Sequence, residues 1–274
     1  SEWFLWVMRS PEKRVEWEDD VQWARVARNM GVMAKFAKAS GFRGLSLDPE
    51  DYTPAKQFDR HPGDRPWKEM AVLVRRRARQ VFTEVFREFP EAVVLGFWLQ
   101  SKGEHRHCHE QDPLYGLEKS NDLLPMFVNG ILDVMPETAT LVDGCEFGYQ
   151  YDAAAGDFAQ SAQRQRDAVY GLIAPENRSR FRQCFQPGFG LYITAFVNEP
   201  KTIAQDNQVY YFPPYKGTRL GYFERNLAAA IRSTGKYVWI WSDKLSWIEF
   251  DKDHKVPTGQ WGVSRELWSN RLPG

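Results

Sequence analysis

The chain has 274 residues, and its 36 Lys and Arg side chains balance 36 Asp and Glu side chains, which gives a formal net charge of zero. This length allows one large domain with a substantial core, and the balanced charge gives no sign of a nucleic-acid or anionic-membrane partner. No apolar stretch reaches about 18 residues and no signal-peptide pattern opens the chain, so we expect a soluble protein. A mature exported chain would share these features, so the sequence does not indicate the cellular compartment.

The three cysteines, Cys108, Cys145 and Cys184, lie far apart in the sequence and form no Cys-x-x-Cys pair. We therefore expect free thiols and neither a disulfide framework nor a cysteine zinc site. The sequence indicates no cofactor.

Apolar patterns predict strands that alternate with amphipathic helices. The expected strands lie at 3–8, 45–47, 93–99, 140–142, 191–197 and 237–241, and the expected helices at 19–41, 64–89, 120–135, 157–172, 176–185 and 218–235. From the second onward the strands recur about every 48 residues. This spacing is typical of βα units, so we predict an α/β fold with a parallel sheet in a single domain over residues 1–274.

Two parallel architectures fit this order. A doubly wound sheet usually carries a glycine-rich phosphate turn after an early strand, and no G-x-G-x-x-G or Walker-type run occurs here. Polar residues instead follow nearly every predicted strand, which favours a (β/α) TIM-type barrel, where strand ends converge on one mouth. Six strands are fewer than the eight of a closed barrel. Either N-terminal strands are missing, or the barrel is incomplete, or strands lie unrecognised in the loops.

The stretch from Gly41 to Tyr52 illustrates the pattern. Leu45 to Leu47 reads as a buried strand, and Pro49 then ends the ladder because it has no N–H to donate. The polar residues expected at the strand ends are Asp48, Glu50, Gln100, Asp143, Glu146, Asn198, Glu199 and Asp243, and the aromatic residues expected beside them are Trp98, Tyr149, Tyr151, Trp241 and Trp247.

Carboxylates at an aromatic-lined mouth suit glycoside hydrolysis, which needs one acid to protonate the leaving oxygen and a second as nucleophile or base. We expect a carbohydrate substrate, with Trp98, Gln100, Tyr149, Tyr151, Asn198, Trp241 and Trp247 in contact with it. Glu50 and Glu146 are the first candidates for catalysis. Further candidates are Asp48, Asp143, Glu199 and Asp243.

The tripeptide Asn198-Glu199-Pro200 resembles the Asn-Glu-Pro motif of clan A (β/α)8-barrel glycoside hydrolases. In that clan the motif lies on the fourth strand and its glutamate is the acid/base, with a nucleophile glutamate on the seventh. Only one predicted strand follows Glu199 here. If two N-terminal strands were missing, Glu199 would lie on strand seven and Glu50 on strand four.

Two alternatives remain open. His105, His107 and His109 alternate in one loop, which suits a zinc-dependent hydrolase, although the charged residues between them favour a solvated loop. A barrel that binds carbohydrate without cleaving it would keep the aromatic residues and tolerate the loss of one acid.

Overall fold

The computed structural model describes residues 2–7, 12–50, 54–101, 113–167, 172–193, 196 and 219–241. It confirms the α/β class and the parallel sheet. The strands are β1 (Phe4–Val7), β2 (Gly44–Leu47), β3 (Val93–Gly96), β4 (Thr140–Asp143), β5 (Phe185–Pro187), β6 (Phe189–Tyr192) and β7 (Val238–Trp241). The helices are α1 (Asp20–Ala39), α2 (Trp67–Glu88), α4 (Pro113–Ser120), α5 (Leu124–Val134), α6 (Asp157–Asp167), α7 (Arg178–Cys184) and α10 (Arg219–Ser233), with short 3-10 turns η1 (Glu146–Gln150) and η3 (Pro175–Asn177).

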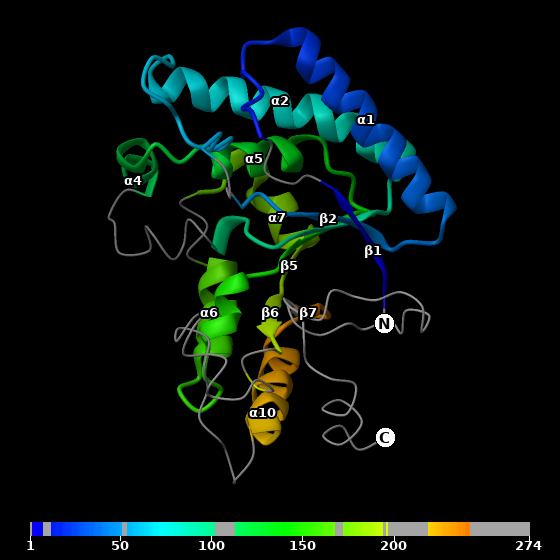
Figure 1. The fold of residues 1–274 in the computed structure, drawn as a ribbon, viewed down its shortest axis with the longest axis vertical. Coiled ribbons are helices and arrows are strands. Elements are labelled where there is room, and N and C mark those ends of the chain that lie inside the picture. The colour runs from blue at the N-terminus through cyan, green and yellow to red at the C-terminus, as the bar shows by residue number, and fades with distance from the viewer. Residues whose placement is uncertain are drawn as a thin grey trace, which may run out of the picture.

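The strands form two parallel sheets, one in the order β1-β2-β3-β4-β5 and one of β6 with β7. Only Gly188 separates β5 from β6, and its N–H donates to the carbonyl of Asp143 over 2.7 Å. The two sheets are therefore joined at the carboxyl end of β4. Figure 1 shows α1, α2 and α5 over the five-stranded sheet and α6 and α10 beside β6 and β7.

Side chains alternate between the two faces of the sheet, as the pleat requires. The outer face packs under α1, α2 and α5 through Leu5, Val7, Leu45, Leu47, Val94 and Leu141. The inner face carries Phe4, Val93, Leu95, Phe97 and Val142, and these pack against Tyr237, just before β7, and Trp239 of β7. Because β7 covers the inner face of β3 and β4, the two sheets curve around a shared interior.

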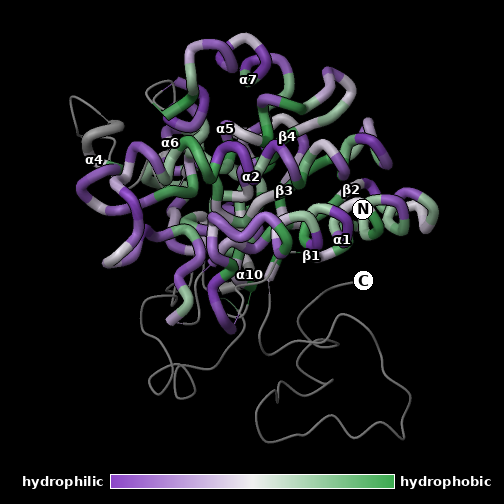
Figure 2. Tube along the Cα trace, turned by 90° about the horizontal axis from the view of Figure 1, so that it is seen from above, coloured by the Kyte–Doolittle hydropathy of each residue, from purple (hydrophilic) through white to green (hydrophobic). Residues whose placement is uncertain are grey.

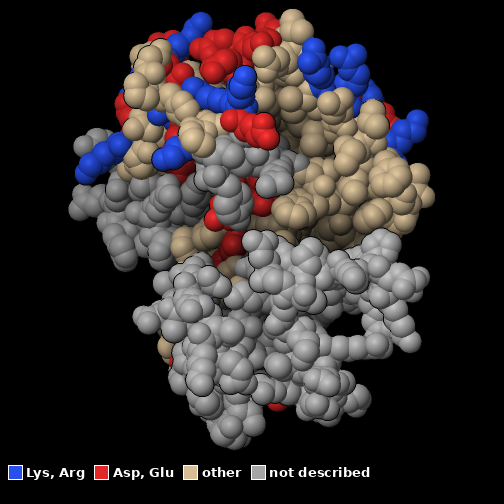
Figure 3. All heavy atoms as spheres, viewed as in Figure 1, with Lys and Arg blue, Asp and Glu red and all other residues tan. Residues whose placement is uncertain are grey.

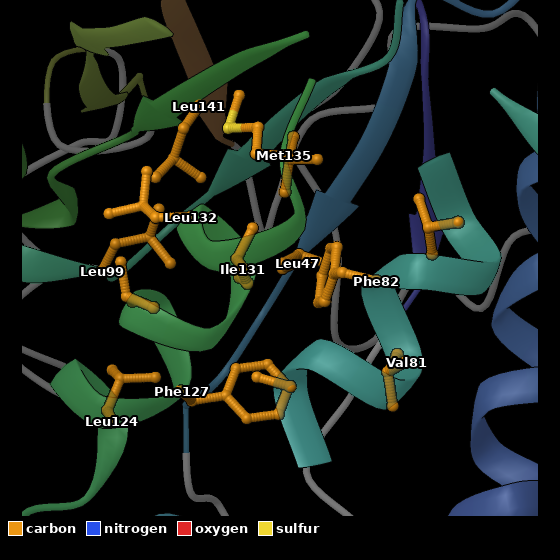
Figure 4. Packing of buried hydrophobic residues seen from close by; sticks show 14 of the residues in the cluster. Leu47, Val81, Phe82, Leu99, Leu124, Phe127, Ile131, Leu132, Met135 and Leu141 are labelled. Atoms are coloured by element: carbon orange, nitrogen blue, oxygen red, sulfur yellow. The ribbon is translucent and has the colours of Figure 1, made fainter. Parts of the chain in front are cut away.

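The outer core is continuous from the helices to β2. Figure 4 shows Phe82 of α2 and Ile131 of α5 close to Leu47, with Phe127 beside them. The Phe82 and Phe127 rings meet edge-on with centroids 6.0 Å apart. Full burial of each such side chain stabilises the fold by about 1.5 to 3 kcal/mol.

Helix boundaries follow local signals in most places. Asp19 caps α1 by accepting from the Gln22 N–H over 2.9 Å, and the helix begins within the range predicted for it, 19–41. The helix predicted at 64–89 begins at Trp67, directly after Pro66, and Asp64 binds Arg14 through both carboxylate oxygens, over 2.9 and 2.8 Å.

Two segments differ from the prediction. Ser120 ends α4, and α5 begins only at Leu124, with a proline in its first turn. The chain also forms two short strands, β5 and β6, where the sequence predicts helix up to 185 and one strand at 191–197. Pro187 and Gly188 interrupt the apolar pattern there, and both residues are poor strand formers.

The described residues form seven strands and no ladder between β1 and β7, so the eight-stranded barrel remains a prediction.

In Figure 2, hydrophilic and hydrophobic residues alternate along the helices that cover the sheet, as in amphipathic helices. In Figure 3, acidic and basic side chains intermingle over α1 and α2, in keeping with the zero net charge. Within the described ranges, no helix is both long enough and apolar enough to cross a membrane.

Candidate active site at the carboxyl edge of the sheet

The parallel ladder continues one residue beyond β3, β4 and β5. The N–H of Phe97 donates to Leu47 O over 3.0 Å, and the N–H of Gly144 donates to Gly96 O over 2.6 Å. Since Leu47, Gly96 and Asp143 are in register, Asp48, Phe97 and Gly144 form the next layer. This layer is the carboxyl edge of the sheet.

Asp48 belongs to the inner face. Ser46 lines the interior cavity together with Leu95, while Leu47 packs on the outer face. Asp48 is two residues beyond Ser46, so strand alternation directs it inward as well. It is 4% exposed, and its Oδ1 accepts from the Glu50 N–H over 3.1 Å, which places Glu50 in the turn just above.

Glu146 approaches the same edge from the other side of β3. Its N–H donates to the carbonyl of Phe97 over 3.1 Å, and it opens η1 as a partly exposed residue. Asp48 and Glu146 therefore flank the end of β3, one from β2 and one from β4. The structure therefore places these two residues and Glu50 at the same edge of the sheet.

The Trp239 side chain lies on the inner face of the sheet, below these acids. Its indole stacks on Phe97 with ring centroids 4.2 Å apart, and its Nε1 donates to Gly144 O over 2.8 Å. A Cβ on Gly144 would lie 2.7 Å from that Nε1, so glycine is required there for the ring to fit. The mouth consequently has an aromatic floor.

Asp143 has a different setting from the other acids. It is fully buried, with Ser101 N–H and Oγ each donating to it over 2.6 Å and Cys145 N–H over 3.1 Å. Burial raises the pKa of Asp143 to about 6, against the lowering effect of these hydrogen bonds. Through these hydrogen bonds Asp143 connects the segment after β3 to the turn after β4, which carries Glu146.

The predicted binding residues separate into two groups. Trp98 lies edge-on to Phe147 of η1 with centroids 4.2 Å apart, Tyr149 lies 5.5 Å from the Trp239 ring, and Trp241 ends β7 on the inner face. Tyr151 packs instead against Phe158 and Phe189, and its hydroxyl hydrogen-bonds Ser161, so it belongs to the core under α6.

Gln100 begins a helical segment four residues after β3. It is fully buried, and neither its amide nitrogen nor its amide oxygen has a hydrogen-bond partner among the described residues. Burial of an amide without a hydrogen bond costs several kcal/mol. The Gln100 amide is therefore a polar group at this edge that could hydrogen-bond a further partner.

The remaining predicted residues lie outside the described residues. These are Asn198, Glu199, Asp243, Trp247, His105, His107 and His109. Within the described part of the chain, no group of three His, Cys, Asp or Glu side chains has an arrangement that could hold a metal ion.

Sequence reasoning missed three residues of this region. Trp239 could have been found, because alternation along 237–241 places it on the same face as Trp241. Ser46 could have been placed inward by the same rule between Leu45 and Leu47. Ser101 carried no signal, because its partner Asp143 is 42 residues away in the chain.

The fold and this edge define an α/β protein with acidic and aromatic residues at the carboxyl ends of parallel strands. No family model matches the sequence, and no curated protein is similar to it. Among solved structures, the catalytic domain of CcCel6A with p-nitrophenyl β-D-cellotrioside has 13% identity and a TM-score of 0.38, covering 86% of this chain and 60% of that one. The catalytic core of the cellobiohydrolase Cel6A from Chaetomium thermophilum has 9% identity and a TM-score of 0.46, covering 88% and 62%.

The chain spans about 60% of the length of these two catalytic domains. At such TM-scores the similarities carry no argument about activity. Any functional assignment therefore depends on the residues at the carboxyl edge.

Proposed function

We propose that this chain is a glycoside hydrolase that cleaves an oligo- or polysaccharide with two carboxylates at the carboxyl edge of its sheet. The observation that carries the proposal is the layer of Asp48, Phe97 and Gly144, which supports two acids, Asp48 and Glu146, on either side of β3 above the aromatic floor of Trp239. Aromatic faces stack on the apolar faces of sugar rings, and acids in pairs perform the bond cleavage. The neutral net charge fits an uncharged substrate.

The spacing of the strands supports an inverting reaction. Asp48 and Glu146 follow strands separated by β3, and two inter-strand spacings of about 4.8 Å place the strand ends about 10 Å apart. Side chains that lean toward each other from there reach the separation of about 6.5 to 9.5 Å at which a water fits between the catalytic base and the sugar. A retaining enzyme would need about 5 Å.

We assign the two roles by access to water. Asp48, at 4% exposure, is the acid that protonates the leaving oxygen. Glu146, partly exposed at the start of η1, is the base that activates the incoming water. Glu50, Glu199 and Asp243 remain proposed members of the site.

The first test is turnover and its dependence on these two acids. We expect the wild type to release reducing ends from at least one member of a panel of neutral polysaccharides. Asp48→Asn and Glu146→Gln should each lower kcat/KM by about 10² to 10⁴, the contribution of a general acid or base. Glu137→Gln is the matched control, because Glu137 is exposed before β4.

Wild-type binding without turnover on the whole panel would favour the carbohydrate-binding alternative. Activity that is unchanged in both carboxylate variants would overturn the assignment of Asp48 and Glu146. Metal analysis of protein purified without a His tag tests the zinc alternative, with bound zinc and its loss in a His105→Ala, His107→Ala double variant as the supporting result.

The second test is stereochemical. We expect the first product seen by proton NMR to have the anomeric configuration opposite to that of the substrate. Retention would show that the working carboxylates are a closer pair than Asp48 and Glu146.

A further inference from the structure

The shared interior opens along one side, between β1 and β7. We call this opening the seam. It contains a cavity of about 630 Å³ lined by both strands and by inner-face residues of β2 and β3, among them Phe4, Ser46, Leu95, Trp239 and Ile240. Side chains reach across it: the rings of Phe4 and Tyr237 lie 5.9 Å apart, and those of Trp6 and Trp241 lie 6.0 Å apart.

Among the described residues, neither strand pairs with another strand along the edge that faces the seam. Trp3 O accepts from Arg43, so the odd-numbered residues of β1 face β2, and the N–H and C=O groups of Phe4 and Trp6 face the other way. Trp241 O accepts from Ile193, so the backbone of Val238 and Ile240 likewise faces away from β6. The described residues form no ladder between these two edges.

The side chains on β7 agree with this reading. Val238 and Ile240 pack outward into the core under α10, yet both also line the cavity. All four residues of β7 are partly exposed, whereas all four residues of β2 and of β3 are buried. The edge of β7 is therefore accessible in a way that the central strands are not.

The amino end of the seam carries excess positive charge. Glu2 lies 2.6 Å from Lys236 Nζ and 3.8 Å from Arg43 Nε, so one carboxylate faces two cations. Arg43 Nε is buried without a hydrogen-bond partner. The nearby Glu91 is paired with Lys38 at 2.8 Å, so the local charge stays at +1.

We propose that the seam binds an extended peptide of about four to five residues, which adds as a parallel strand between β7 and β1 and carries an acidic residue at its amino end. Strand addition uses main-chain hydrogen bonds for affinity and alternate side-chain positions for specificity. Here the peptide pairs with Phe4 and Trp6 on one side and with Val238 and Ile240 on the other. Its acidic residue meets Lys236 and Arg43, and its inward side chains meet Phe4, Leu95 and Trp239.

This inference goes beyond the proposed hydrolysis, because it uses the edges of β1 and β7 and neither carboxylate of the mouth, although the peptide's inward side chains would contact Trp239, which also forms the floor of the mouth. A glycan in the seam would leave the four backbone amides without the paired partners that a peptide supplies. Direct closure of β1 onto β7 would instead remove the cavity.

The test is amide exchange by NMR, with ¹⁵N-labelled Phe, Trp, Val and Ile in the full chain. The probe is acetyl-Glu-Val-Thr-Val-Thr-amide, and its control is the same peptide with Lys in place of Glu. We expect the amides of Phe4, Trp6, Val238 and Ile240 to exchange quickly in the free protein and at least tenfold more slowly at millimolar probe. The amides of Val7 and Trp239, which face β2 and β6, should not change.

A pair of variants checks the backbone contact. Ile240→Pro removes a seam N–H at an edge position where proline is tolerated, and Ile240→Val keeps it. We expect at least tenfold weaker probe binding for Ile240→Pro, near wild-type binding for Ile240→Val, and at least fivefold weaker binding of the Lys peptide. If Ile240→Pro fails to fold, the exchange data on the wild type still decide.

Three results would overturn the proposal. The four amides could already be protected in the free protein, which would mean that β1 pairs with β7. The probe could leave their exchange unchanged. A neutral β-linked glucose tetramer could protect the same amides while the peptide does not, which would assign the seam to a sugar.

Discussion

At the scale of single residues, the most informative group is Asp143. Its pKa of about 6 lies above the value of a free aspartate because the carboxyl is fully buried. Between about pH 4 and pH 6 the folded state therefore holds a proton that the unfolded state has lost, and the contribution of Asp143 to stability falls as the pH rises through this window. Above pH 6 the ionised carboxylate depends on the hydrogen bonds from Ser101 and Cys145.

Ser101→Ala removes the 2.6 Å hydroxyl donor and should raise the pKa of Asp143 further. We expect a loss in the free energy of unfolding of about 1.5 to 3 kcal/mol at pH 8, the value of a hydrogen bond to a charged group, and about half of that at pH 4.5. Urea denaturation at both pH values measures it. Ser233→Ala is the control, since its hydroxyl donates to the neutral carbonyl of Ala229 and its effect should not depend on pH. Equal losses at both pH values for Ser101→Ala would contradict the role given to Asp143.

At the scale of elements, apolar periodicity and capping residues located β1 to β4, β7, α1 and α2 to within a few residues. Short elements that follow one another with almost no loop between them were harder to predict. β5 and β6 together span only eight residues and are separated by Gly188 alone, and α5 is preceded by α4, a helix that the sequence did not predict, with Asn121 and Asp122 in the link between them. In the site, strand alternation places Asp48 and Trp239, but the Ser101–Asp143 bond depends on a tertiary contact that no local pattern encodes.

The crossing of α2 and α5 gives a prediction at this scale. A Cβ on Gly130 would lie 2.3 Å from Arg75 O and 2.5 Å from the Cβ of Ala78, so the two helices meet at a glycine. Gly130→Ala should destabilise the protein by about 1 to 3 kcal/mol through overpacking, despite the better helix propensity of alanine. A Cβ on Gly31 of α1 would lie 3.2 Å from the Cβ of Glu84 and 3.5 Å from its carbonyl oxygen, so Gly31→Ala should change stability by less than about 0.5 kcal/mol. Thermal and urea unfolding of both variants compare them, and a neutral Gly130→Ala would show that the helices separate without cost.

At the scale of the whole molecule, the chain has two unequal halves. The larger half buries the core of α1, α2 and α5 against a five-stranded sheet, and the smaller half buries the core of α6 and α10 against only β6 and β7. Two-stranded units have little stability of their own. The seam lies where the two halves meet without a ladder, and the acidic mouth spans the join at Gly144 and Gly188. Both the proposed catalysis and the proposed peptide site therefore depend on how the smaller half is held against the larger one.

We accordingly expect the two halves to open at different free energies. Hydrogen exchange under native conditions should show the amides of β6, β7 and α10 opening at lower free energy than those of β2, β3 and α2, because local opening follows the amount of buried apolar contact. Phe158→Ala, in the smaller core, should lower the opening free energy of β6 and β7 by about 3 to 5 kcal/mol and leave β2 and β3 near their wild-type values. Phe82→Ala, in the larger core, should lower the opening free energy throughout, because the smaller half cannot stay folded once its supporting sheet is lost. A uniform loss in both variants would mean that the chain unfolds as one cooperative unit and that the seam is no boundary between halves.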